Sequence, residues 1–138
     1  MKYMILLYAS QQDYEAMQGK SSVKKAWTGE QLGAMGAFME KFHQEIAESG
    51  ELVDAQGLDA PVHARRIQMR GGVPVVTDGP YPEAQEVLAG YTIVECPSFD
   101  RATELAARMS ECPPGPEGAE GLYCDVRPII DGREYLDV

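Results

Sequence analysis

The chain has few of the residues that form disulfide scaffolds and metal centres. Its three cysteines, Cys96, Cys112 and Cys124, are odd in number and form no C-x-x-C pair. That spacing excludes a disulfide framework and provides no zinc motif. The two histidines, His43 and His63, stand too far apart in the sequence to make a metal-binding motif. We therefore predict no metal and no cofactor, and we expect Cys96 and Cys124 to pack as small apolar groups.

Basic residues and long apolar runs are also scarce. Lys plus Arg number 12 against 22 Asp plus Glu, so the formal net charge is −10. Such a surface repels nucleic-acid phosphates and anionic lipid, so we expect neither nucleic acid nor a membrane as a partner. The longest N-terminal apolar run, residues 4–8, is too short for a signal peptide or a membrane span. We expect a cytoplasmic protein.

The remaining composition is that of one globular domain. The chain has 138 residues, of which 44% are apolar and 25% charged, enough for a single domain over residues 1–138 with its own core. The glycine-rich stretches contain neither G-x-G-x-x-G nor G-x-x-x-x-G-K-S/T, and no G-x-S-x-G occurs. These absences give no support to a phosphate-binding loop or a nucleophile elbow.

Two segments have the periodicity of amphipathic helices. Thr28 and Gln31 fit a capping box at the start of the first, and Gly50 suits its end. The apolar positions of this helix recur in steps of three and four: Leu32, Met35, Met39, Phe42 and Ile46, with Phe38 beside them. Ser98 caps the second helix, whose apolar face is Ala102, Leu105, Ala106 and Met109.

The other segments predict strands. They cover residues 2–8, 52–58, 64–70, 73–77, 88–96 and 122–130, the last with Leu122, Cys124 and Val126 facing inward. Gly71-Gly72 predicts a hairpin turn, residues 11–27 a loop with a short helical piece, and residues 131–138 a partly exposed polar tail. Without the extra hairpin the order is βαββαβ. This predicts an α+β, ferredoxin-like fold with an antiparallel sheet and both helices on one face.

The strand at residues 2–8 is apolar on both of its sides. In the predicted fold the helices cover only one face of the sheet, so the other face would be bare in a single chain. A bare apolar face predicts a partner, and a second copy packed sheet to sheet is the simplest one. We expect a homodimer through the sheet face.

The stretch Asp78-Gly79-Pro80-Tyr81 is the strongest candidate for a functional site. A stiff turn of this kind presents the Asp78 carboxylate as an acid, a base or an anchor for a cation. The same residues also suit a purely structural turn, in which Asp bonds the backbone and Gly supplies a positive φ. Glu83 then either crowds other carboxylates in a pocket or belongs to a solvated acidic surface.

Other polar residues offer alternatives of the same kind. His43 flanks the apolar stripe of the long helix, where it lines a pocket or is a half-buried helix residue. Tyr91 lies in a strand and supplies either packing or a hydrogen-bonding pocket wall. Arg65 and Arg66 form local ion pairs or hold an anionic ligand.

Several stretches resemble one known family. They are residues 1–8, Gly57-Leu58, residues 76–83, Glu86, residues 88–91 and residues 126–129. The chain is similar in these to the DGPF branch of the YCII-related superfamily, along nearly its whole length. The resemblance implies a ferredoxin-like fold and dimers of the α/β-barrel type. It implies little about activity, although members are often encoded near extracytoplasmic-function sigma factors.

The wider superfamily has been suggested to hold an enzyme site of a His and an Asp, with the His near the start of the long helix. The comparable residues here, 32–39, contain no His, and His43 comes about a turn later. Tyr81, Pro82 and Gln85 stand where the motif usually has Phe, Ala and Lys. The His–Asp pair is therefore not carried over to this chain.

Two functional hypotheses follow. In the first, the chain is a small-molecule enzyme or ligand-binding protein with a pocket near the turn at residues 78–81. Asp78 is its catalytic residue, and the binding residues are His43, Gly79, Pro80, Tyr81, Glu83 and Tyr91. In the alternative, the chain is a non-catalytic dimeric module that acts with a transcription regulator. Its acidic surface then contacts a basic protein.

Overall fold

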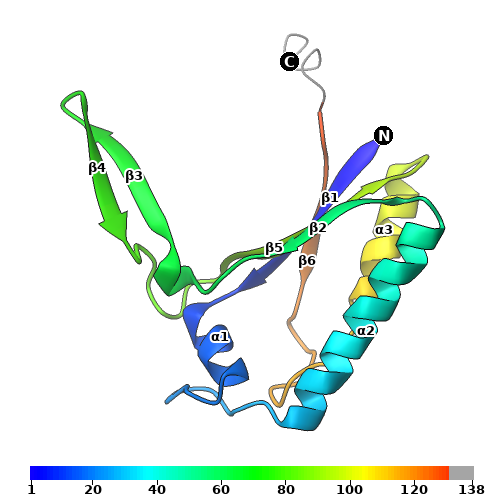
Figure 1. Ribbon diagram of the computed structural model, residues 1–138, viewed down its shortest axis with the longest axis horizontal. Helices are drawn as coiled ribbons and strands as arrows, with labels where there is room; N and C mark the ends of the chain where they lie inside the picture. Colours follow the sequence, from blue (N-terminus) through cyan, green and yellow to red (C-terminus); the bar gives the residue numbers. More distant parts are fainter. Residues whose placement is uncertain (131–138) are drawn as a thin grey trace.

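A computed structural model describes residues 1–130 of the chain (Figure 1). The elements in chain order are β1 (Lys2–Ala9), α1 (Gln11–Met17), α2 (Gly29–Glu48), β2 (Leu52–Gly57), the 3-10 turn η1 (Pro61–His63), β3 (Arg65–Arg70), β4 (Val73–Asp78), β5 (Val87–Glu95), α3 (Phe99–Met109) and β6 (Cys124–Pro128). The predicted tail at residues 131–138 lies outside the described residues.

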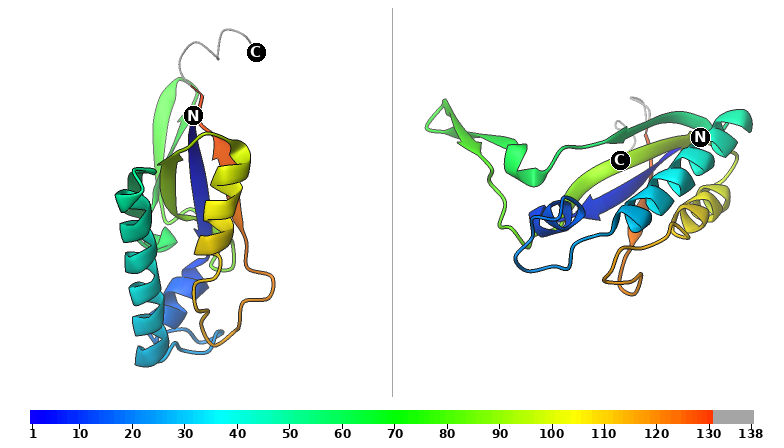
Figure 2. Two further views of the ribbon diagram at one scale, coloured as in Figure 1. Left: turned by 90° about the vertical axis from the view of Figure 1, so that its right-hand side faces the viewer. Right: turned by 60° about the horizontal axis from the view of Figure 1, so that its bottom comes forward.

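Four of the strands form one antiparallel sheet in the order β2-β5-β1-β6. The helices α2 and α3 lie on the same face of this sheet (Figures 1 and 2). This is a mixed α+β architecture consistent with the predicted ferredoxin-like fold. Within residues 1–130 the other face has no helix on it, and we call it the open sheet face.

The long helix begins and ends where the sequence predicts. The amide of Gln31 donates to the Thr28 hydroxyl at 3.1 Å, and the Thr28 amide donates to the Gln31 side chain at 3.0 Å. Gly50, just beyond the C-terminal end, has a φ of 80°, which favours glycine. The short helical piece predicted within residues 11–27 is α1, capped in the same reciprocal way by Ser10 and Asp13.

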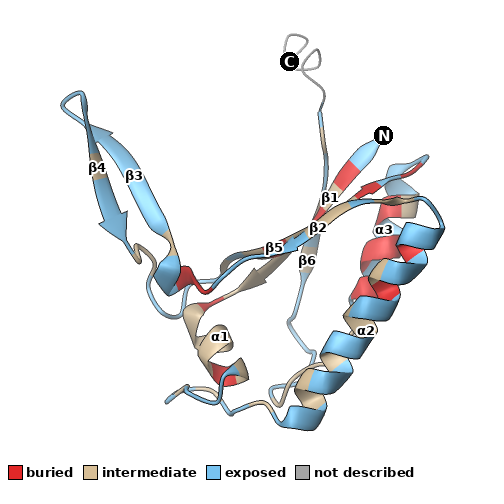
Figure 3. Ribbon diagram, in the orientation of Figure 1, coloured by how far each residue is buried: buried red, intermediate tan, exposed pale blue. Residues whose placement is uncertain are grey.

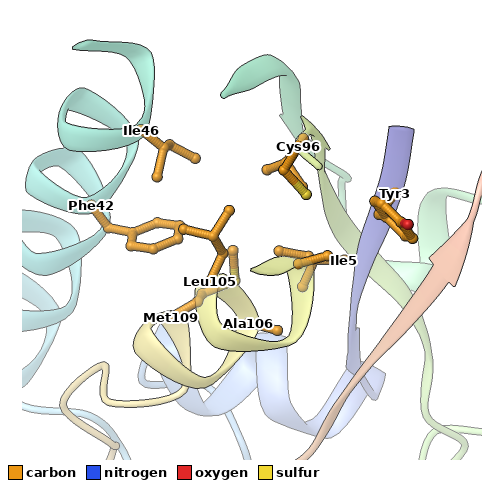
Figure 4. Packing of buried hydrophobic residues seen from close by; sticks show 10 residues of the cluster. Tyr3, Ile5, Phe42, Ile46, Cys96, Leu105, Ala106 and Met109 are labelled. Carbon is orange, nitrogen blue, oxygen red and sulfur yellow. The ribbon is translucent and has the colours of Figure 1, made fainter. Parts of the chain in front are cut away.

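The core lies between the sheet and the two long helices (Figure 4). Its buried members are Tyr3, Ile5, Phe42, Ile46, Val94, Cys96, Ala102, Leu105, Ala106 and Met109. The predicted apolar face of α3 is buried in full, whereas on α2 only Phe42 and Ile46 are buried. The C-terminal part of α2 is therefore the most deeply buried in the core, while Phe38 and Met39 pack against the core but are only partly buried.

The last strand is shorter than predicted. It begins at Cys124, so Leu122 lies in the preceding loop and is 70% exposed. The prediction that Leu122 faces inward is wrong, because the strand alternation had been extended into this loop.

The hairpin β3–β4 is separate from the main sheet. Its strands pair with each other through the predicted turn at Gly71-Gly72, and within residues 1–130 they join no other strand. Figure 1 shows the hairpin standing off the end of the main sheet, on the side away from α2 and α3. It therefore extends beyond the open sheet face.

Candidate functional site

A cavity of about 670 Å³ lies beside the inner side of α2, and we call it the His43 cavity. It is lined by Leu7, Met39, His43, the β2 residues 52–57, and residues 89–92 of β5. Its volume is in the range of small-molecule sites, roughly 300–1,000 Å³. The space lies beside the stretch of α2 whose inward-facing side chains are half-buried, rather than buried as Phe42 and Ile46 are.

A second cavity, of about 360 Å³, adjoins the first and shares Leu7 and Met39 with it. We call it the sulfur-lined cavity. Its lining includes Met35, Met39, Met109, Cys112, Cys124 and Trp27. Burial raises the pKa of the Cys112 thiol, which favours the neutral, apolar form. The two cavities together form an apolar space along α2, with polar groups at one end.

His43 is the ionisable side chain that α2 contributes to this space. Its Nε2 lies 3.0 Å from the Oγ1 of Thr92, and Thr92 is only 1% exposed. Its ring also meets the Phe42 ring edge-on, with the centroids 5.5 Å apart. These two contacts hold the imidazole in one orientation. The arrangement provides hydrogen-bonding groups close to the apolar side chains of Leu7 and Met39, where they can hold one oxygen of a ligand.

Tyr91 borders the same cavity from β5, but its side chain lies on the open sheet face, because it pairs with Leu6 whereas Thr92 pairs with the core residue Ile5. Its hydroxyl donates to the Asp54 carboxylate on the neighbouring strand β2 at 3.3 Å. Partial burial, and then the nearby negative charge of Asp54, raise the pKa of Tyr91. The phenol therefore stays protonated at neutral pH. Of the predicted site residues, His43 and Tyr91 are the two that line the His43 cavity.

Asp78 lies elsewhere, at the end of β4 where the hairpin joins the body. Its Oδ1 accepts from Arg65 Nε at 2.6 Å across the hairpin, and its side chain is 73% exposed. Asp78 is not among the lining residues of either cavity. Arg65 thus makes the local ion pair that was one of its two predicted roles.

Gly79 has a structural reason to be glycine. Its φ is +55°, and a Cβ there would lie 3.3 Å from the Val62 carbonyl oxygen. Its amide donates to the Ala64 carbonyl at 2.8 Å. The turn is therefore held against the segment that precedes β3. Pro80 is half-buried in this turn, and Glu83 is exposed, with its backbone carbonyl accepting from the Gln12 amide at 3.2 Å.

Tyr81 borders a third cavity, of about 410 Å³, at the base of the hairpin. The Arg66 guanidinium stacks over its ring, 5.1 Å from the centroid. His63 also lines this cavity, and its Nδ1 lies 3.0 Å from the Asp59 carboxylate. The predicted site residues are thus divided between two places, the His43 cavity and the hairpin base.

Sequence reasoning missed the sulfur-lined cavity because its residues read as ordinary core. The stripe positions Met35 and Met39 match a packed helix face, and only the uneven burial of α2 separates them from Phe42 and Ile46. One usable signal was the choice of flexible methionine where other core stripes have branched side chains. Trp27 gave no signal, since it lies in the loop before the helix.

Two features of residues 1–130 bear on metal ions and membranes. Among these residues, His, Cys, Asp and Glu side chains do not gather in threes in a way that could hold a metal ion. Within the same range no helix combines the length and apolar character needed to cross a membrane.

Comparison with known proteins agrees with the fold. The chain is 29% identical over 108 residues to an uncharacterised protein of Rhizobium meliloti (strain 1021), covering 78% of this chain and 83% of that protein. Residues 1–130 match the YCII-related domain. The match spans β1 to the end of β6 and includes both cavities. The chain therefore belongs to the YCII-related domain family.

Proposed function

We propose that this protein binds a small, mainly apolar molecule in the space along α2, with His43 as its polar anchor. The observation that carries the proposal is the His43–Thr92 pair on the wall of a cavity of about 670 Å³. Pockets that combine apolar walls with a few fixed polar groups are typical of ligand sites. The adjoining sulfur-lined cavity extends the apolar part of the space.

The chemistry of the walls defines the class of ligand. Methionine and cysteine side chains with Trp27 suit an aliphatic or aromatic body, because polarisable sulfur packs well against both. The Thr92 hydroxyl and the His43 ring suit a carboxylate, carbonyl or phenol oxygen. If the ligand is a substrate, His43 is placed to exchange a proton with that oxygen.

The test is a titration with octanoate, phenylacetate and p-cresol, read by the fluorescence of Trp27, the chain's single tryptophan. We expect saturable binding of at least one probe and a rise in Tm as its concentration increases. His43→Gln should weaken that binding about tenfold, since one hydrogen bond to the ligand is lost. Glu40→Gln, at an exposed position of α2, is the control and should bind as the wild type does.

The proposal fails if none of the three probes binds saturably, or if His43→Gln binds the responding probe as tightly as the wild type. A protein that binds no probe but retains a basic protein partner from cell extract would favour the non-catalytic alternative. The formal charge of −10 is the feature that suits such a partner.

We also infer that two chains associate through the open sheet face. Met4 and Leu6 of β1 and Ile93 of β5 give this face an apolar centre, since these residues pair or alternate on one side of the sheet. All three are half-buried in the single chain. A second copy on this face would cover them.

We also propose that the chain belongs to the DGPF branch of the family, on the basis of residues 78–80 and Gly90-Tyr91.

Acid–base chemistry by Asp78 is a separate proposal, at the hairpin base. Its support is an accessible carboxylate three residues before Tyr81, which borders the third cavity. Asp78→Asn removes the acid and most of the attraction to Arg65. Loss of turnover without unfolding would support the catalytic role. Unchanged ligand behaviour with a small loss of stability would overturn it and leave a structural turn.

A further inference from the structure

The β3–β4 hairpin has no core of its own. Every residue of β3 is exposed, and β4 is exposed except at Val75 (Figure 3). A two-stranded hairpin in water is marginally stable, because three strands or a packed face are normally needed. The hairpin therefore needs a support that the described part of a single chain does not give it.

One face of the hairpin is apolar beyond the Arg65–Asp78 ion pair at its base. Ile67 pairs with Val76 and Met69 with Pro74, so these four side chains lie on the same side. Ile67 is 60% exposed and Val76 is 55% exposed. A contiguous exposed apolar patch of this kind marks an interaction surface. The opposite face carries Arg66 and Arg70 and is polar at those positions.

The charge of the hairpin differs in sign from that of the body. Residues 65–78 contain three arginines and one aspartate, a formal charge of +2. The whole chain carries −10, so the remainder carries −12. Oppositely charged surfaces attract, and the body of a second copy carries this acidic charge.

The position of the hairpin also favours a second copy. It stands off the sheet on the side of the open sheet face (Figure 1). A chain that packs on that face would meet the hairpin as well as the sheet. The edges of the open face carry carboxylates, Asp54 on β2 and Asp125 on β6, each bonded to a tyrosine hydroxyl. The face thus combines an apolar centre with acidic edges.

We propose that the β3–β4 hairpin is a dimerisation arm, whose Ile67–Val76 face packs on the body of a second copy of this chain. This rests on the dimer inferred in the proposed function and extends it from the sheet to the arm. In a two-fold dimer each arm would hold the other protomer, so the contact occurs twice. The partner would supply the packing that the described part of the arm's own chain does not give it.

The first test is the oligomeric state by sedimentation over a wide range of concentration. We expect wild-type dimers, and we expect Ile67→Asp with Val76→Asp to raise the dissociation constant at least about tenfold. Both positions are exposed in one chain, so the fold of the body should survive. The control is Ala37→Asp with Gln44→Asp, which adds the same charge at exposed α2 positions and should leave the dimer intact.

A sheet variant separates the arm from the dimer itself. Leu6→Lys places a charge in the apolar centre of the open sheet face and should give monomers. If it does, while the Ile67/Val76 variant dimerises like the wild type, the arm inference is overturned and the sheet dimer stands. If the wild type is monomeric at all concentrations, both inferences are overturned.

Hydrogen exchange gives a second readout that does not depend on variants in the arm. The amides of β3 and β4 should be protected in the wild-type dimer and should exchange rapidly in monomeric Leu6→Lys. Equal, rapid exchange in both proteins would overturn the arm inference.

Discussion

The two halves of α2 show how one amphipathic pattern can serve two purposes. In the C-terminal half, Phe42 and Ile46 are buried against α3 and the sheet. Towards the N-terminal end, Met35 and Met39 are half-buried and line the sulfur-lined cavity, although Met39 also packs against the core. The same spacing of apolar residues thus packs on protein at one end and borders empty space at the other. The difference separates the residues that stabilise the fold from those available to a ligand.

Ion pairs to α3 also distinguish the C-terminal end of α2 from its N-terminal end. Arg108 of α3 bonds Glu45 in the C-terminal half at 2.6 Å, and Arg101 bonds Glu51, just beyond the end of α2, through two nitrogens at 2.9 Å each. These pairs fix the C-terminal end of α2 to α3. The N-terminal end of α2 makes its reciprocal hydrogen bonds within its own cap, between Thr28 and Gln31.

The largest expected loss of stability comes from substitution in the C-terminal part of α2. Ile46→Ala should lower the free energy of unfolding by about 3 kcal/mol, because the side chain is fully buried and leaves a cavity. Met35→Ala, at a half-buried position beside existing space, should cost about 1 kcal/mol. Urea unfolding of both variants measures the contrast. Equal losses of unfolding free energy in the two variants would mean that both ends of α2 pack alike, which would contradict the difference in burial between them.

A smaller effect is expected at the wall of the sulfur-lined cavity. Trp27 packs directly on the backbone of Gly115, so a methyl group at that position would collide with the indole ring. Gly115→Ala should therefore displace Trp27, change its fluorescence and cost about 1–3 kcal/mol. An unchanged emission spectrum would show that Trp27 does not lie against Gly115 in solution.

The smallest effect is expected from the ion pair with Arg101. Hydrogen bonds from Arg101 and Ser49 hold the pKa of Glu51 below its usual value of 4.5. Because the folded-state pKa is the lower one, the stability that this carboxylate adds is present above about pH 4.5 and is lost as the pH falls through the folded pKa. Glu51→Gln should cost about 1 kcal/mol near neutral pH.

The pH dependence of Glu51→Gln supplies its own control. The difference in unfolding free energy between wild type and variant should shrink towards zero in acid, where the carboxylate is protonated. A difference that is constant down to acid pH would assign the effect to packing rather than to the ion pair. Glu104→Gln, which removes the more exposed partner of Arg101, should cost less.

Much of the fold follows from local patterns in the sequence. The capping box at Thr28, the Gly71-Gly72 turn and the apolar face of α3 each specify an element through chemistry within a few residues. The strand order follows because the βαββαβ sequence leaves few ways to cover one sheet face. The exposure of Leu122 could not be predicted from the sequence, because strand alternation alone does not show where a strand begins.

The candidate site was less predictable than the fold. His43 and Tyr91 were identified singly, but nothing local shows that they border one cavity or that Asp78 lies at the hairpin base instead. These are facts about packing between distant segments. The uneven burial of α2 is of the same kind, because it depends on where the loops around Trp27 hold the helix.

The most direct test of the cavity proposal is methyl NMR of the seven methionines during titration with octanoate or phenylacetate. Met35, Met39 and Met109 line the sulfur-lined cavity, whereas Met4 lies on the open sheet face and Met69 on the hairpin. We predict saturable shifts of the three cavity methyls, with Met4 and Met69 unchanged. Shifts at Met4 or Met69 with none at Met39 would contradict a ligand site beneath α2.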